Sequence, residues 1–226
     1  MIGNSRYSKI IAAVVVAVIT GKILLDSRAA KTDITADAGV SQKTIGMVEE
    51  AYHLLPPEIR TAIGEHGTGV RILENGDTIS SAYGITNLNA TKDQNGCFVW
   101  DGTADIFING SQPDSEVKKT VIHEAGHWTD AYVGELLDLS GAPCDKVSDV
   151  SSNTVDFKDI YETEKEMSGW NAYVTRAPSE YYAESFYVFL TDPDTLRERQ
   201  PHTYEYMKED MERVVGGKYA ATEHAQ

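Results

Sequence analysis

The sequence predicts an α+β domain that follows a short apolar leader. Strand-like segments come first and helix-like segments later, an unbroken apolar run lies within the first 25 residues, and 226 residues suffice for one domain with a sizeable core. Hydrophobic residues make up 41% of the chain, which excludes a disordered chain and a multispanning membrane protein. We expect a small, mainly antiparallel sheet with helices that carry the active site.

Residues 1–29 have the pattern of a secretory signal peptide: a basic start, a short apolar run at Ile10–Thr20 and small residues around a candidate cleavage site after Ala29. An uncleaved membrane anchor is the alternative, although a spanning helix needs about 20 apolar residues. Either segment predicts a protein that is secreted or held at the extracellular face of the membrane. Residues 30–42 are polar and small and are interpreted as a linker, so the domain is expected at 43–226.

The first half of the domain is expected to hold two helices, one separate strand and a hairpin. Apolar residues at helical spacing are ended by Pro56-Pro57, and the second proline is suited to begin another helix. Turn residues bound the strands. The predicted elements are helices over Lys43–Leu55 and Pro57–Ile63, a strand over Val70–Leu73, and hairpin strands over Cys97–Trp100 and Ala104–Asn109.

The second half is expected to be helical. Asp114 or Ser115 is a candidate N-cap for a long helix through Val133, and Ser179 is a candidate N-cap for another. Asp192-Pro193 ends that second helix. The predicted helices are Ser115–Val133, residues 154–168, Ser179–Leu190 and Pro201–Val215. This order of strands and then helices is typical of the α+β class.

Charge and cysteine content exclude several classes of protein. The chain has 35 acidic and 20 basic residues, a net charge of −15, which argues against binding to nucleic acid or to anionic lipid. Two cysteines, Cys97 and Cys144, are too few for a zinc ribbon or a disulfide-rich scaffold. A disulfide between them and two buried thiols remain equal alternatives. Histidines and carboxylates must therefore hold any metal, and no motif indicates an oligomeric state.

The long helix contains the sequence His123-Glu124-Ala125-Gly126-His127, an H-E-x-x-H motif. Residues four apart lie on one face of a helix, so both imidazoles point the same way at a separation that one zinc ion can bridge. Glu124 lies beside them, where it can act as general base toward a water molecule. The motif therefore predicts a zinc-dependent hydrolase.

A catalytic zinc needs a third protein ligand. Val133 stands where a third histidine would follow the motif, so a carboxylate from a later helix is expected. Glu180 and Glu184 share one face of the predicted helix Ser179–Leu190. One glutamate would bind the metal and the other would hold a histidine by its second N–H, and the residues alone do not decide which. Three rival carboxylates, Glu162, Glu164 and Glu166, are interpreted as solvated surface.

These motifs resemble the catalytic domain of the anthrax lethal factor type, a group that includes the small secreted Pro-Pro endopeptidases. The resemblance runs from about Leu54 to Tyr206 and depends on the H-E-x-x-H block and on E-Y-Y-A-E-S-F, which Tyr173 precedes by seven residues. It implies a zincin-like fold with one zinc ion held by His123, His127 and Glu180. It further implies Glu124 as general base, Tyr173 as the donor to the oxyanion and Glu184 behind a ligand histidine.

We therefore expect a zinc-dependent endopeptidase that acts on a protein or peptide and contacts no membrane beyond a possible N-terminal anchor. The resemblance suggests proline near the scissile bond, with pocket residues in Tyr83–Asp101 and Gly134–Asn153. The strand Ala104–Asn109 could bind substrate at a free edge, or it could be internal. The alternative is a surface adhesin or toxin-like binding module that keeps zinc without turnover, against which the intact Glu124 argues.

Overall fold

The computed structural model describes residues 32–74, 95–99, 105–137 and 149–223, with side chains described up to residue 216. The chain divides into two compact units, residues 1–30 and 31–226, and only the second contains described residues. The predicted signal peptide or anchor lies outside the described ranges and stays a prediction. None of the described helices combines the length and apolar composition that crossing a bilayer requires.

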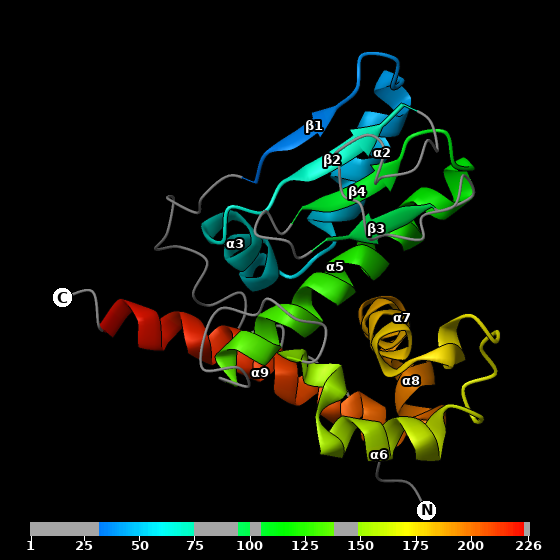
Figure 1. Ribbon diagram of the computed structural model, residues 1–226, viewed down its shortest axis with the longest axis vertical. Helices are drawn as coiled ribbons and strands as arrows, with labels where there is room; N and C mark the ends of the chain where they lie inside the picture. The colour runs from blue at the N-terminus through cyan, green and yellow to red at the C-terminus, as the bar shows by residue number, and fades with distance from the viewer. Residues whose placement is uncertain (1–31, 75–94, 100–104, 138–148, 224–226) are drawn as a thin grey trace, which may run out of the picture. The chain divides into compact units, whose positions relative to one another are not determined.

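Four strands form one sheet in the order β1-β2-β4-β3 (Figure 1). Pairs β1–β2 and β2–β4 are parallel, and β3–β4 is antiparallel. The α+β class is confirmed, but the expectation of a mainly antiparallel sheet is wrong for these strands. The strands are Ile34–Ala36 (β1), Val70–Leu73 (β2), Gly96–Phe98 (β3) and Ile106–Asn109 (β4).

Strand β1 adds one of the two parallel pairs, and it lies inside the segment that was interpreted as a linker. Residues 30–42 contain this three-residue strand, and Ile34 pairs with Val70 of β2. Helices α2 (Gln42–His53) and α3 (Pro57–Glu65) connect β1 to β2. Such a helical crossover returns the chain in the same direction, so the two strands run parallel. The segment 30–42 is therefore partly a strand of the sheet.

Every helix and strand predicted for the described residues is present; most ends shift by up to four residues, and the last helix ends at Glu223 instead of Val215. Two caps differ from expectation: α5 begins after Pro113, and α7 begins at Pro178 after an extended Ala177 instead of being capped by Ser179. Helix α8 was not predicted, and Asp192 caps it by accepting from the Thr195 N–H. The remaining elements are α5 (Asp114–Leu136), η2 (Ser151–Asn153), α6 (Val155–Glu164), η3 (Val174–Arg176), α7 (Pro178–Thr191), α8 (Pro193–Arg199) and α9 (Pro201–Glu223).

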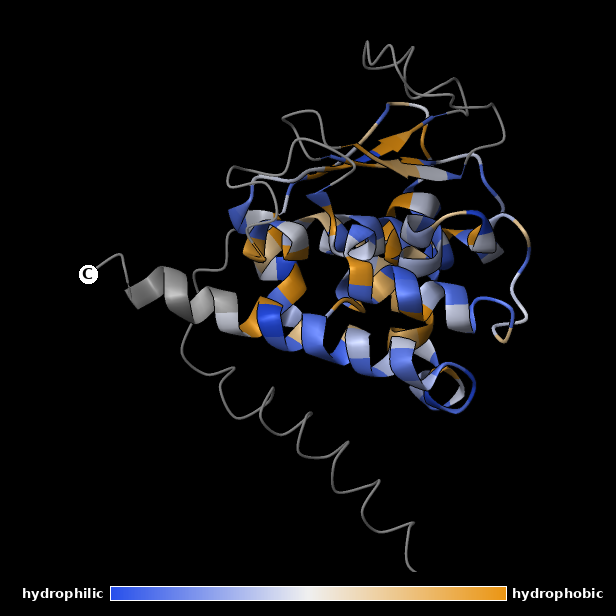
Figure 2. Ribbon diagram, turned by 60° about the horizontal axis from the view of Figure 1, so that its bottom comes forward, coloured by the Kyte–Doolittle hydropathy of each residue, from blue (hydrophilic) through white to orange (hydrophobic). Residues whose placement is uncertain are grey.

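Helix α5 is the central element of the domain. It contacts strands β3 and β4 and helix α2, and it also contacts α7 and α9 (Figure 1). Figure 2 shows mainly apolar strands and helices of mixed polarity. Ile108 of the sheet and Val121 and Trp128 of α5 are buried in one core cluster. The Trp128 indole N–H donates to Thr68 Oγ1 at 2.8 Å, so this large residue is buried with its polar group satisfied.

One of the three rival glutamates is buried, contrary to the sequence-based expectation. Glu164 at the end of α6 is fully buried and accepts hydrogen bonds from the backbone N–H groups of His202 and Thr203, both at 2.9 Å. It caps the first turn of α9, whose N–H groups have no partner within the helix. Glu162 and Glu166 are exposed as expected. The interpretation of Glu164 as solvated surface is therefore wrong.

Two buried aspartates join α5 and α9 to the η2 segment. Asp130 accepts from the Ser152 N–H and hydroxyl, both at 2.6 Å. Asp210 accepts from Tyr182 at 2.7 Å and from Ser151 at 2.9 Å. Burial raises the pKa of Asp130 to about 8, although the hydrogen bonds from Ser152 oppose the rise.

The raised pKa of Asp130 predicts a stability that falls with increasing pH. Between about pH 4 and pH 8 the unfolded chain ionises this carboxyl while the native protein keeps its proton, so the free energy of unfolding falls by at most about 1.4 kcal/mol per pH unit. Asp130→Asn removes this contribution. Urea unfolding of both proteins at several pH values in this window gives the free energy of unfolding at each pH. This free energy should fall less steeply with pH in the variant than in the wild type. The same pH dependence in both proteins would contradict the raised pKa of Asp130.

Candidate metal centre

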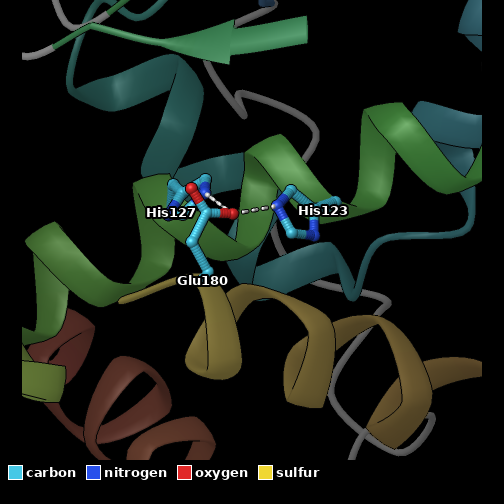
Figure 3. A group of neighbouring side chains, drawn as sticks. All are labelled: His123, His127 and Glu180. Carbon is cyan, nitrogen blue, oxygen red and sulfur yellow. Dashed lines mark ion pairs between the residues drawn. The ribbon is translucent and has the colours of Figure 1, made fainter. Parts of the chain in front are cut away.

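The two histidines of the motif lie one turn apart on α5, as the i, i+4 spacing predicts. Their rings are 4.9 Å apart between centroids and nearly perpendicular to each other. Both side chains turn to the same side of the helix, toward α7 (Figure 3). Burial lowers the pKa of His127 to about 3, so this imidazole is neutral near pH 7 and one of its two ring nitrogens has a free lone pair.

Glu180 of α7 reaches between the two imidazoles. Its Oε2 atom lies 3.4 Å from His123 Nε2 and 3.8 Å from His127 Nε2 (Figure 3). One ligand atom from each of these three residues lies within 4.8 Å of the others, and this is the group in the described residues that could hold a metal ion. The structure thus joins the motif to a glutamate that lies 53 residues after His127.

Unsatisfied polar atoms show that this group suits a cation. Glu180 Oε2 is buried and has no hydrogen-bond partner among the described residues. Such an orphaned carboxylate oxygen is costly unless something positive faces it. Burial raises the pKa of Glu180, but His123 and Arg176 outweigh this effect and lower it to about 2, so the group is an anion. Two imidazoles and one carboxylate match the donor set of a metal site with an open position.

Gly126, inside the motif, allows α7 to come this close. A Cβ at this position would lie 2.9 Å from Ala183 Cα and 3.2 Å from Phe186 Cβ, which is closer than van der Waals contact. Helices α5 and α7 therefore touch through backbone at the middle of H-E-x-x-H. The H-E-x-x-H pattern assigns no role to Gly126, so this contact was not predicted from the sequence.

Glu184, one turn after Glu180, faces the other nitrogen of His123. Its Oε2 lies 3.5 Å from His123 Nδ1, and its Oε1 accepts from Lys119 Nζ at 2.7 Å. Burial lowers the pKa of His123, but the carboxylates of Glu180 and Glu184 outweigh burial and raise it to about 9. In the metal-free protein His123 therefore carries a proton that balances the negative charge of the two glutamates.

Glu124 is buried beside the histidines. Only 7% of its surface is exposed, and burial raises its pKa to about 7. Gly96 of β3 makes room for it, since a Cβ there would lie 2.8 Å from Glu124 Cγ. The edge strand of the described sheet thus packs directly on the carboxylate, which keeps it dry and poised to exchange a proton near neutral pH.

Tyr173 lies at the exposed side of the site, just before η3. Half of its surface is exposed, and its hydroxyl donates to Glu180 Oε1 at 3.4 Å. Arg176 Nη2 donates to the same oxygen at 2.8 Å. Sequence reasoning missed Arg176 and Lys119. Their spacing of four residues from Glu180 and His123, respectively, is the signal that could have found them.

Several predicted features fall elsewhere. Strand β4 lies between β2 and β3, so the predicted strand Ala104–Asn109 is internal, and its interpretation as a free edge for substrate is wrong. Cys97 is buried, and burial raises the pKa of its thiol to about 12. Cys144 lies outside the described residues, so the disulfide is untested. The predicted pocket segments Tyr83–Asp101 and Gly134–Asn153 also lie mostly outside them.

Comparison with known proteins places the chain in a family. The model of the anthrax toxin lethal factor, N- and C-terminal domain, matches residues 41–210. The chain belongs to the anthrax lethal factor family. Among solved structures, this member of the family resembles the Pro-Pro endopeptidase of Paenibacillus alvei, with a TM-score of 0.55 and 16% identity over 78% of this chain and 96% of that one. At this identity the likeness shows a common fold. No curated protein matches the chain.

Proposed function

We propose that the protein is an exported zinc-dependent endopeptidase. One observation carries the proposal: the buried Oε2 of Glu180, which has no hydrogen-bond partner among the described residues, lies within 4 Å of both motif histidines, with Glu124 buried beside them. Membership of the lethal factor family and the fold of a Pro-Pro endopeptidase support peptide-bond hydrolysis. Two histidines from an H-E-x-x-H motif on a helix, with a carboxylate as third donor, favour zinc.

His123, His127 and Glu180 would hold the ion. When bound, zinc supplies a Lewis acid that polarises the scissile carbonyl and lowers the pKa of water toward about 7. Glu124 accepts a proton from the attacking water and returns it to the departing amine, because a carboxyl with a pKa of about 7 exchanges protons in both directions near neutral pH.

Tyr173 and Glu184 complete the proposed machinery. The exposed hydroxyl of Tyr173, beside the ligand carboxylate, donates to the oxyanion that forms on the substrate. Glu184 faces Nδ1 of His123 and so would leave the Nε2 lone pair of that ring available to hold an ion. Lys119 pairs with the second oxygen of Glu184 and keeps it ionised.

The substrate is proposed to be an extended protein or peptide outside the cell. Export is expected from the pattern of residues 1–29. A preference for proline at the scissile bond is supported by the family resemblance and by the structural relative, which is a Pro-Pro endopeptidase. The second candidate function, a zinc-retaining adhesin or toxin-like binding module, is disfavoured because the buried general base and the exposed tyrosine both remain.

Cleavage of a peptide library by the purified protein tests the proposal. Hydrolysis that a zinc chelator abolishes and added zinc restores would support the enzyme, and the cut sites would show whether proline flanks the scissile bond. Zinc binding without cleavage of any peptide would favour the binding module. A protein that binds no zinc would overturn the proposal.

His123 is expected to release a proton when zinc binds. Its pKa of about 9 in the metal-free protein means that the imidazole is protonated at pH 6.5 and must lose that proton to offer a lone pair. The apparent zinc affinity should therefore rise about tenfold per pH unit below pH 9. Calorimetric titrations in two buffers of different protonation enthalpy would count the protons. A count of zero would contradict the assigned charge of His123.

A further inference from the structure

The proposed mechanism requires the phenol of Tyr173 at a fixed place, yet packing does little to hold its ring. Of this residue, 52% is exposed. Asn171 fixes the backbone, because its Oδ1 accepts from the N–H groups of Tyr173 and Val174 at 2.9 and 3.2 Å. The hydroxyl makes only a long contact of 3.4 Å to Glu180. An exposed ring without further support samples several rotamers and loses entropy when it is ordered.

Arg176 supplies the missing support. Its guanidinium carbon lies 3.7 Å from the centroid of the Tyr173 ring, a close cation–π contact, and its Nη2 donates to Glu180 Oε1 at 2.8 Å. A planar guanidinium can stack on an aromatic face and donate from its edge at the same time, which an ammonium group cannot. Arg176 therefore joins the ring to the ligand carboxylate.

The hydrogen bond from Arg176 to Glu180 also determines which oxygen of Glu180 faces the histidines. Arg176 and Tyr173 both donate to Oε1, and this leaves Oε2 to face His123 and His127 at 3.4 and 3.8 Å. An arginine bound to one oxygen of a carboxylate limits its rotation, because turning the group would break a charge-assisted hydrogen bond. Arg176 thus holds the Tyr173 ring against the Glu180 oxygen that faces away from the histidines.

We propose that Arg176 is a positioning residue that fixes the Tyr173 phenol against Glu180, and that it acts on catalysis through Tyr173. The inference rests on the proposed function, because the proposed function makes Tyr173 the donor to the oxyanion during hydrolysis. The contacts of Arg176 are with the Tyr173 ring and with Glu180 Oε1, the oxygen that is turned away from the histidines. Its removal is therefore expected to lower kcat and to leave KM and zinc stoichiometry nearly unchanged.

Kinetics of single and double variants of the full chain test this coupling. Arg176→Gln should lower kcat about tenfold with KM within about twofold, because the tyrosine donor is partly lost. Arg176→Lys should restore little, because it keeps the charge without the planar stack. In the Tyr173→Phe background, Arg176→Gln should lower kcat by less than about twofold. Equal losses in both backgrounds, or no loss in the wild-type background, would overturn the proposal.

Arg197 offers a matched control. It also pairs with an acidic residue, Asp194, at 2.5 Å, and it also lies over a tyrosine, Tyr204, with 5.6 Å between the guanidinium carbon and the ring centroid. It lies on α8, outside the proposed machinery. Arg197→Gln should leave kcat, KM and zinc content unchanged, and a loss equal to that of Arg176→Gln would mean that a general loss of surface charge explains both.

Hydroxyl-radical footprinting of the metal-free protein gives a readout that needs no activity. Oxidation of the peptide that contains Tyr173 should rise about twofold in Arg176→Gln, because the stacked face of the ring becomes accessible, and it should not change in Arg197→Gln. An unchanged footprint in Arg176→Gln would overturn the inference alone. A wild-type protein that binds no zinc and cleaves no peptide would instead overturn the proposed function, whatever the footprint.

Discussion

Glu124→Gln is expected to abolish most hydrolysis while one zinc ion stays bound. Glutamine has nearly the same shape as glutamate, so it fits the space that Gly96 leaves beside the side chain. It cannot accept and return a proton, and loss of a general base typically costs about 10²–10⁴-fold in rate. Peptide cleavage and bound zinc should be measured on the same preparation.

Glu116→Gln is the matched control for this variant, since Glu116 lies on the first turn of the same helix, away from the histidines. It should cleave peptide at the wild-type rate. A Glu124→Gln protein that cleaves as fast as the wild type would show that the general base is another residue. Loss of zinc from Glu124→Gln would show that Glu124 is needed for metal binding. The lost activity would then be no evidence that Glu124 transfers a proton.

Replacing Glu180 of α7 by alanine is expected to weaken zinc binding more than replacing Glu184 of the same helix. Glu180→Ala removes the carboxylate that lies between both histidines, so zinc affinity should fall by more than 100-fold. Glu184→Ala removes only the partner of His123 Nδ1, and the loss should be about 10–100-fold, which is typical of groups behind a ligand.

Zinc dissociation constants from competition with a chromogenic chelator would rank the two variants. Thermal unfolding of the metal-free proteins serves as the control, because both substitutions remove a partly buried carboxylate from the same helix. Equal losses of affinity, or a larger loss for Glu184→Ala, would contradict the ligand assignment.

Local spacing made part of the site predictable. His123 and His127 lie on one face of α5 because any helix puts residues i and i+4 there, and an amphipathic pattern was enough to place the helix. The choice of Glu180 over Glu184 depends on how α7 packs on α5, which periodicity does not contain. Family resemblance supplied that choice before the structure placed Glu180 between the histidines.

Long-range contacts made the rest unpredictable. Strand β1 has only three residues, too few for an alternating pattern, and it exists because β2 pairs with it. Glu164 sits in a charge-dense segment and is nevertheless buried, because the first turn of α9 needs an acceptor. In both cases the deciding partner lies more than 30 residues away in sequence.

Close packing at Gly126 has a consequence for the whole domain. The proposed ligands come from α5 and α7, so a bound ion would join two helices that the chain connects only through a long intervening segment. An ion that binds the native state alone stabilises it according to its free concentration, by about 2.7 kcal/mol at 100 times the dissociation constant. Under the proposed export and zinc binding, the zinc supply outside the cell would affect the lifetime of the protein as well as its turnover, and zinc-free molecules would be the first to be degraded by proteases.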